Sequence, residues 1–284
     1  MNTLRVFFLL LLMTLLFMAV GYAIGKQSGM LIAFIIAALM NFFSYWYSSK
    51  LVLKRYKAQE VTEATHRRFY RIAGNVALKA SMPMPRLYTI PSKAPNAFAT
   101  GRNESHAAVA VTEGLLEILN DDELEGVIGH EIAHIKNKDM LIGTIAATLA
   151  GAIAMLAMMA RWGFVLGGLS RNDRGGSPLA TLAAMIVAPL AAMLIQMAVS
   201  RSREFKADAE SVQITGHSRP LANALAKLHS TPARLNLDRT PETAHLFIAN
   251  PLSGKGLSSL FSTHPPVKKR IEKLEEMALS GYGG

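Results

Sequence analysis

The chain of 284 residues contains no cysteine. This absence excludes disulfide bonds, thiolate metal ligands and a thiol nucleophile, so any metal ion must be held by His, Asp or Glu. Charged residues are also few, at 18% of the chain, whereas hydrophobic residues make up 51%. The apolar residues gather in long runs, as is typical of a protein whose solvent is partly lipid. The composition therefore argues against an ordinary soluble domain.

Acidic residues are outnumbered, since 30 Lys and Arg against 20 Asp and Glu leave a formal net charge of +10. Basic chains often bind nucleic acid, but here the basic residues flank apolar runs and form no nucleic-acid-binding motif. Lys and Arg that collect on the cytoplasmic side of membrane spans explain the charge. We therefore expect the basic residues to lie next to a lipid bilayer and not to bind nucleic acid.

Four apolar runs are each about 20 residues long, the length at which a helix crosses roughly 30 Å of hydrocarbon. They cover residues 6–24, 29–47, 141–160 and 179–199. The first run has the basic flank of a cleaved signal peptide, but a second run follows almost at once, which favours an uncleaved hairpin. Runs three and four are nearly free of charge, which favours membrane spans over buried core helices.

Lys and Arg near the ends of the runs predict the orientation. With the N-terminus inside, more of them lie inside (Arg5, Lys50, Lys54, Arg55, Lys57, Lys136, Lys138, Arg201, Arg203, Lys206) than outside (Lys26, Arg161, Arg171, Arg174). Both soluble portions then lie in the cytoplasm. The sequence thus predicts a membrane hairpin (1–47), a first soluble part (48–140), a second membrane hairpin (141–199) and a second soluble part (200–284).

The soluble portions predict an α+β fold that is mainly helical, with a small sheet. A helix over about 60–80 is followed by strand-like segments at 86–90, 97–100 and 106–111. Thr112 can cap a short helix through Leu119. Asn120 with Glu123 three residues later forms a capping box, which predicts a helix over about 121–138.

The helix predicted from residue 121 contains the sequence His130-Glu131-Ile132-Ala133-His134. Four residues advance a helix by about 400°, so the two imidazoles lie on one face and can reach one metal ion. Glu131 lies on the adjoining flank, where it can take a proton from water. The alternative is a surface helix with two histidines beside a salt-bridging glutamate. The apolar residues around the motif argue against it, because a surface helix would be more polar. The arrangement is typical of zinc metallopeptidases.

A catalytic zinc ion normally has three protein ligands, so a third must come from elsewhere. Asn137 and Met140 stand where the metzincin pattern has a glycine and a histidine, which excludes that class. Asp139 lies nine residues beyond His130, about 180° round a continuous helix, so we expect it to face away from the imidazoles.

Glu204 is the better candidate, because runs three and four are predicted to form an antiparallel hairpin. His134 lies about 10 Å before run three and Glu204 about 7–8 Å after run four, so both reach one side of the membrane at a similar depth. Asp208, one helical turn further, can orient a ligand imidazole. The alternative is that both carboxylates pair with Arg201 or Arg203 as solvated charges.

Four segments in this order carry a family resemblance: 95–98 (Pro-Asn-Ala-Phe), 111–139, 202–208 and 262–266 (Ser-Thr-His-Pro-Pro). The chain resembles the HtpX-type membrane peptidases, which are gluzincin relatives of the type 1 CAAX prenyl proteases. The resemblance implies that Glu204 is the third ligand of one Zn²⁺ ion. It also implies that Asn96 lies on the strand that holds the substrate and that His264 stabilises the tetrahedral intermediate.

The expected reaction is hydrolysis of a peptide bond, in which Glu131 takes a proton from water and passes it to the leaving amine. The resemblance implies quality control of damaged or unfolded membrane proteins at a bacterial inner membrane, with the catalytic domain in the cytoplasm. One alternative is a specific processing protease of the CAAX type, whose relatives have more than four spans. The other is a membrane scaffold with a structural metal site, which would need a fourth protein ligand.

The predicted topology is testable with two labels. A label between Ser170 and Ser177 should react with a membrane-impermeant reagent in intact cells, because this loop is predicted to lie outside. A label after Gly284 should react only once the membrane is permeabilised. Equal access at both positions would mean that runs three and four do not span the membrane.

Overall fold

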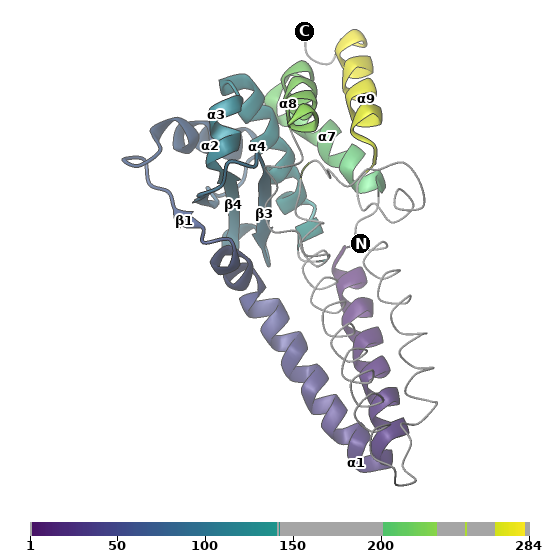
Figure 1. Cartoon of the computed structure of the whole chain (residues 1–284). Coiled ribbons are helices and arrows are strands. Elements are labelled where there is room, and N and C mark those ends of the chain that lie inside the picture. Colours follow the sequence, from purple (N-terminus) through teal and green to yellow (C-terminus); the bar gives the residue numbers. More distant parts are fainter. Residues whose placement is uncertain (1, 141, 143–200, 232–247, 249–264, 282–284) are drawn as a thin grey trace, which may run out of the picture.

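The computed structural model describes residues 2–140, 142, 201–231, 248 and 265–281 (Figure 1). The predicted runs at 141–160 and 179–199 lie outside these residues, apart from residue 142, and so does His264. Helices dominate the described part of the chain, and they pack on a single small sheet. This is the mainly helical α+β architecture that the sequence predicts.

Helix α1 (Asn2–Arg55) is a hairpin whose bend lies at Gly25 and Lys26, where the backbone leaves the helical region. Its two arms meet at the bend and diverge toward the sheet (Figure 1). A Cβ atom on Gly21 would lie 2.4 Å from the carbonyl oxygen of Gly29, so the absence of a side chain lets the arms touch. Asn41 Nδ2 donates a hydrogen bond to Thr14 Oγ1 across the hairpin, at 3.1 Å.

The second arm of α1 is the better candidate for a membrane span. Its segment Gly25–Tyr47 is 23 residues long and only 6% buried within the protein. Among the described helices it is the one that is long and apolar enough to cross a membrane; the apolar helix Val6–Tyr22 of the first arm is shorter. The described residues thus contain one such segment of the four that the sequence predicts.

The sheet has four strands in the order β1-β2-β4-β3. Strands β2 (Arg86–Ile90) and β4 (Ala107–Thr112) are parallel, whereas β1 (Gln59–Glu60) and β3 (Ala97–Gly101) pair antiparallel with them. The strand predictions for β2, β3 and β4 are confirmed to within one residue at each end. The prediction of a helix from residue 60 is wrong at its start, because residues 59–60 pair with β2 and α2 (Arg67–Lys79) begins later.

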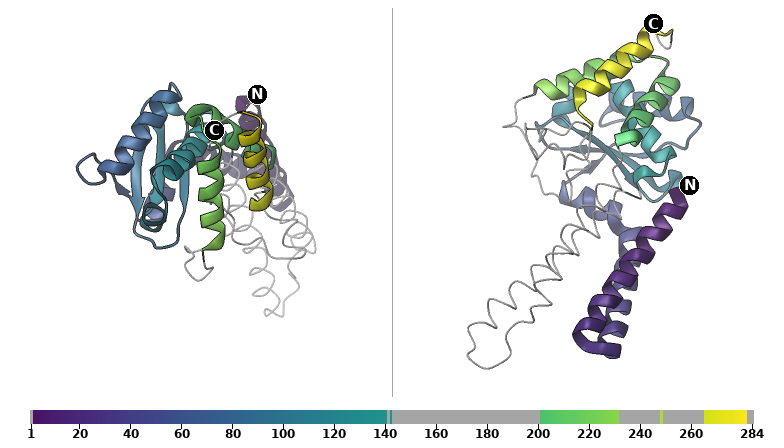
Figure 2. Two further views of the ribbon diagram at one scale, coloured as in Figure 1. Left: turned by 90° about the horizontal axis from the view of Figure 1, so that it is seen from above. Right: turned by 90° about the vertical axis from the view of Figure 1, so that its right-hand side faces the viewer.

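Both faces of the sheet are covered, as the alternation along β4 shows. Val109 and Val111 belong to the main core beneath α2 and α4 (Asp121–Lys136), whereas Ala108 and Ala110 belong to a second cluster at the end of α1. Figure 2 shows the helical layer and the end of α1 on opposite sides of the sheet. Tyr56, just beyond α1, packs on Phe98 with 5.7 Å between ring centroids. Because neighbouring strand residues point to opposite faces, one strand joins the helical layer to the hairpin.

Helix α4 lies at the centre of the helical layer and carries the predicted His-Glu-x-x-His sequence. It follows the short helix α3 (Glu113–Ile118), which Thr112 caps by accepting from Leu115 N. It begins with the predicted capping box of Asn120 and Glu123, a type of cap that contributes roughly 0.5–2 kcal/mol. Helices α7 (Arg201–Thr215) and α8 (Arg219–Ser230) pack against it, and α9 (Val267–Leu279) packs on α8.

The contact between α4 and α7 is especially close. Ser211 Oγ of α7 donates to the carbonyl oxygen of Gly126, at 2.8 Å. A Cβ atom on Gly129 would lie 2.7 Å from the same Oγ, so any larger residue there would separate the helices. This close approach places the first turn of α7, with Glu204, beside the histidines of α4.

Candidate metal centre

Three side chains from two helices converge at the contact between α4 and α7. The Nε2 atoms of His130 and His134 lie 3.1 Å apart. The Glu204 carboxylate faces both, with Oε2 3.7 Å from His130 Nε2 and Oε1 3.5 Å from His134 Nε2. His130 and Glu204 are buried and His134 is partly buried. The structure therefore brings together the three residues that the sequence predicts as metal ligands.

The donor set fits a zinc ion in both chemistry and spacing. Two imidazole nitrogens and a carboxylate oxygen suit zinc, which binds them at about 2.0–2.2 Å. Two atoms bound tetrahedrally at that distance lie about 3.3 Å apart. One ligand atom from each of His130, His134 and Glu204 lies within 4.8 Å of the others, so small side-chain movements give this spacing.

His130 is held by Asp208, one turn beyond Glu204 on α7. Asp208 Oδ1 lies 2.9 Å from His130 Nδ1, the ring nitrogen that faces away from His134. Burial works against the Asp208 carboxylate, but Arg270 and His130 outweigh this effect and lower its pKa. The charged carboxylate thus fixes the ring so that Nε2 points toward Glu204.

The prediction that Asp139 faces away from the imidazoles is wrong. It assumed a helix through residue 138, but α4 ends at Lys136 and Lys138 adopts a left-handed conformation with φ of 58°. This turn carries Asp139 back to the site, where its Oδ2 lies 3.3 Å from His134 Nδ1. Asp139 Oδ1 also lies 3.6 Å from Arg203 Nη1 on α7. Each imidazole therefore has its own carboxylate partner.

The electrostatic surroundings of His134 favour a cation. Burial lowers the pKa of His134, but the carboxylates of Asp139 and Glu204 outweigh it and raise the pKa to about 10. At neutral pH the imidazole therefore carries a proton when no metal ion is bound. Because an imidazole binds a metal ion only in its neutral form, a metal ion that binds here displaces this proton.

Asn96 lies one residue before β3 and is only 3% exposed. Its backbone amide donates to Thr112 Oγ1, and its side-chain oxygen accepts from the Ile248 amide at 3.2 Å. Ile248 in turn accepts a 2.7 Å hydrogen bond from Arg270 Nη1 through its carbonyl oxygen. The Asn96 side chain thus holds Ile248 next to Arg270, an arrangement that the sequence did not predict.

Arg270 on α9 is the residue of this site that the sequence analysis missed. It is fully buried and contacts Asp208 at 2.6 and 2.8 Å and Glu204 at 3.2 Å. Burial lowers its pKa, but Asp208 and Glu204 outweigh this effect and raise it above the ordinary value for arginine. The signal was present, since Arg270 shares the apolar stripe of α9 with Val267 and Leu274, where a surface arginine would not lie.

The helix with two histidines, the distant glutamate on a second helix and the sheet alongside define a metallopeptidase. The chain belongs to peptidase family M48, whose sequence model matches residues 59–278. It is 54% identical over 276 residues to a protease HtpX homolog of Desulfatibacillum aliphaticivorans, across 96% of this chain and 89% of that protein. An HtpX homolog of Thermodesulfovibrio yellowstonii is 52% identical over 281 residues, across 98% and 99% of the two chains.

The fold is similar to that of a solved structure, Ste24p of S. mikatae. The TM-score is 0.56 at 15% sequence identity, and the match covers 92% of this chain. The chain spans 62% of the length of that structure. At this identity the similarity supports the fold, and it agrees with the predicted resemblance to HtpX-type peptidases and their CAAX-protease relatives.

Removing the positive charge of the buried Arg270 side chain should destabilise the protein strongly. Arg270→Met keeps much of the side-chain volume but leaves Asp208 and Glu204 buried without their partner. We expect the free energy of unfolding to fall by about 3–5 kcal/mol, as when one member of a buried ion pair is deleted. Denaturant unfolding of the full chain in detergent, followed by circular dichroism, measures this change.

Two further variants distinguish charge compensation from lost packing. Lys269→Met, at the exposed neighbouring position, should change the free energy of unfolding by less than about 0.5 kcal/mol. Adding Asp208→Asn to Arg270→Met should recover part of the loss, because one uncompensated carboxylate is gone. An Arg270→Met variant as stable as the wild type would contradict this role.

Proposed function

We propose that the protein is a zinc-dependent endopeptidase that acts at the cytoplasmic face of a membrane on damaged or unfolded membrane proteins. The observation that carries this proposal is the convergence of His130, His134 and Glu204, with Glu131 next to the first of them in α4. A structural metal site would leave no role for Glu131, which is only 4% exposed. Membership of a peptidase family supports the same reading.

Zinc is the metal that the donor set favours. The three proposed ligands are two imidazoles and a carboxylate, and the sequence has no cysteine to offer. Three protein ligands leave one position open, which is the arrangement of catalytic and not of structural zinc. When bound, zinc supplies a Lewis acid that polarises a carbonyl oxygen and makes water more acidic.

Glu131 is the proposed general base. Its carboxylate is buried, and its negative charge contributes to the raised pKa of both His134 and Arg270, so it lies near the three ligands. From there it can take a proton from water as the water attacks a peptide carbonyl, and it can return the proton to the leaving amine. Asp208 and Asp139 keep the two imidazoles in place during these steps.

The outer edge of β3 is the proposed binding site for the substrate backbone. Strand β3 stands at the end of the strand order, and among the described residues it pairs only with β4. An extended polypeptide that pairs with such an edge is recognised mainly through its backbone, which implies a broad sequence preference. Asn96 directly precedes β3, and its side-chain oxygen accepts a hydrogen bond from the Ile248 amide. His264 keeps its predicted role in stabilising the tetrahedral intermediate.

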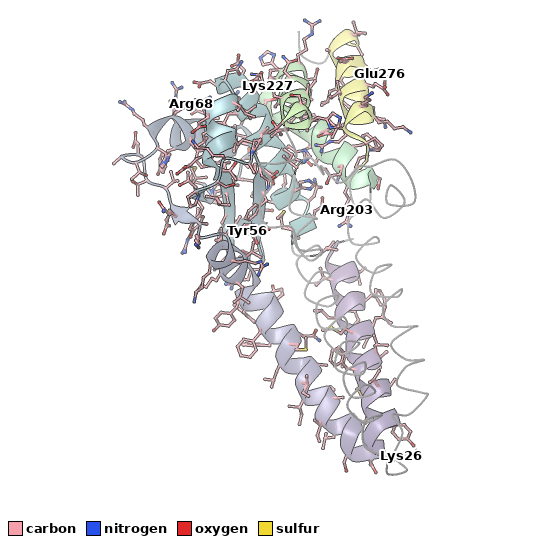
Figure 3. All side chains as sticks on the ribbon, viewed as in Figure 1. Lys26, Tyr56, Arg68, Arg203, Lys227 and Glu276 are labelled. Atoms are coloured by element: carbon pink, nitrogen blue, oxygen red, sulfur yellow. The ribbon has the colours of Figure 1, made fainter. Side chains whose placement is uncertain are left out.

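A multi-pass location in a bacterial inner membrane completes the proposal. The apolar arm Gly25–Tyr47 is exposed over most of its surface, as expected for a helix in lipid. Lys54 and Arg55 form the last turn of α1 on the side of the sheet, whereas Lys26 lies at the far end of the hairpin (Figure 3). More basic residues flank the sheet side, which favours a cytoplasmic catalytic domain.

Glu131→Gln should abolish peptidase activity and leave the metal site intact. The substitution removes the base but not a proposed metal ligand, so cleavage of casein in detergent should fall by about 10²- to 10⁴-fold. Zinc content, measured by elemental analysis, should stay at that of the wild type. Chelation should inactivate the wild type, and added zinc should restore it.

The matched control is Glu275→Gln, which makes the same change at an exposed position of α9 and should retain full activity. Cleavage by Glu131→Gln within tenfold of the wild-type rate would reject Glu131 as the base. Loss of zinc from this variant would instead give Glu131 a structural role.

A further inference from the structure

A shallow, open hollow lies between the β3–β4 hairpin and the end of α4. One wall is formed by β3 and the loop that follows it, including Thr100 and Arg102. The other wall is formed by Ile135 of α4 and by Lys138 and Met140 of the turn beyond it. None of the proposed metal ligands lines this hollow.

The hollow has the chemistry of an anion site. Neither Arg102 nor Lys138 forms an ion pair with a carboxylate in the part of the chain that the structure describes. Two cations without counter-ions fit the oxygens of a phosphate group.

Arg102 is also fixed in place, so the site is built and not merely basic. Its guanidinium lies over the ring of Trp46, with Cζ 4.2 Å from the centroid. His106 Nδ1 donates to Asn103 Oδ1, which leaves His106 Nε2 to accept from Arg102 Nη2 at 2.8 Å. These contacts orient the guanidinium before any ligand binds.

Trp46 gives the level of the hollow relative to a bilayer. It is 44% exposed and stands one residue before the end of the apolar segment Gly25–Tyr47. Tryptophan at the end of a span lies at the depth of the lipid headgroups. Arg102 stacks on Trp46, so the hollow opens at the depth where phospholipid phosphates lie.

We propose that this hollow binds the phosphate of an anionic phospholipid headgroup, held by Arg102 and Lys138. The proposal rests on the proposed placement of α1 in a membrane. A lipid bound here lies beside the turn that carries Asp139 to His134 and beside the strand proposed to bind substrate. The bound lipid would therefore hold the catalytic domain against the membrane next to the proposed metal and substrate sites.

Quenching of Trp46 by brominated lipids tests this site directly. The sequence has two tryptophans, so Trp162→Phe leaves Trp46 as the single reporter in the full chain. In nanodiscs of mixed composition, brominated phosphatidylglycerol should quench Trp46 more than brominated phosphatidylcholine at the same mole fraction. This preference should fall about fivefold for each of Arg102→Gln and Lys138→Gln.

The control variant Lys268→Gln/Lys269→Gln removes two exposed charges from α9 and should keep the full preference. Equal quenching by the two lipids in the wild type, or a preference that survives Arg102→Gln/Lys138→Gln, would overturn the proposal. Loss of the preference on adding inorganic phosphate would show a site for free phosphate instead. Quenching by neither lipid would reject the membrane placement of α1 itself. Because the measurement does not use peptidase activity, its outcome is independent of the proposed catalytic function.

Discussion

The close packing of α4 against α7 is the constraint on which the rest of the site depends. A metal ion accepts ligands only at about 2 Å, so Glu204 must be held within a few ångströms of two histidines that lie far away in the sequence. The missing side chain at Gly129 permits this approach, and the hydrogen bond from Ser211 to Gly126 fixes it. At the end of α4, Asn137 donates to Glu210 of α7 at 2.5 Å, which secures the same contact at a second point.

Buried charge is arranged around this contact in a connected network. Asn96 holds Ile248, Ile248 accepts from Arg270, and Arg270 binds the Asp208 that orients His130. On the other side Asp139 links His134 to Arg203. The carboxylates of Glu131, Glu204, Asp208 and Asp139 outnumber the two arginines, so the centre favours a divalent cation. Partners of this kind set ring orientation and ligand basicity, and their loss typically costs 10–100-fold in metal affinity.

Patterns among neighbouring residues predicted most of the described fold, but only some of the buried polar residues around the metal centre. The capping box at Asn120, the strand patterns and the spacing of His130 and His134 depend on neighbouring residues, and the structure agrees with each. Glu204 was predicted from a hairpin of runs three and four that lies outside the described residues, and Glu204 itself lies beside the two histidines. Asp139 and Arg270 were not, because one depends on a left-handed residue at 138 and the other on how α9 docks. Such tertiary features leave only weak traces, such as a charged residue within an apolar helical stripe.

Metal stoichiometry in variants of the carboxylates tests the central claim that a ligand from α7 completes a site on α4. At a free zinc concentration just sufficient to saturate the wild type, Glu204→Ala should bind almost no zinc. Asp208→Asn and Asp139→Asn should still reach one zinc ion per chain at about 10–100-fold higher concentration, because each retains all three ligands. Full zinc binding by Glu204→Ala together with its complete loss in Asp139→Asn would place the third ligand beside α4 and contradict the account.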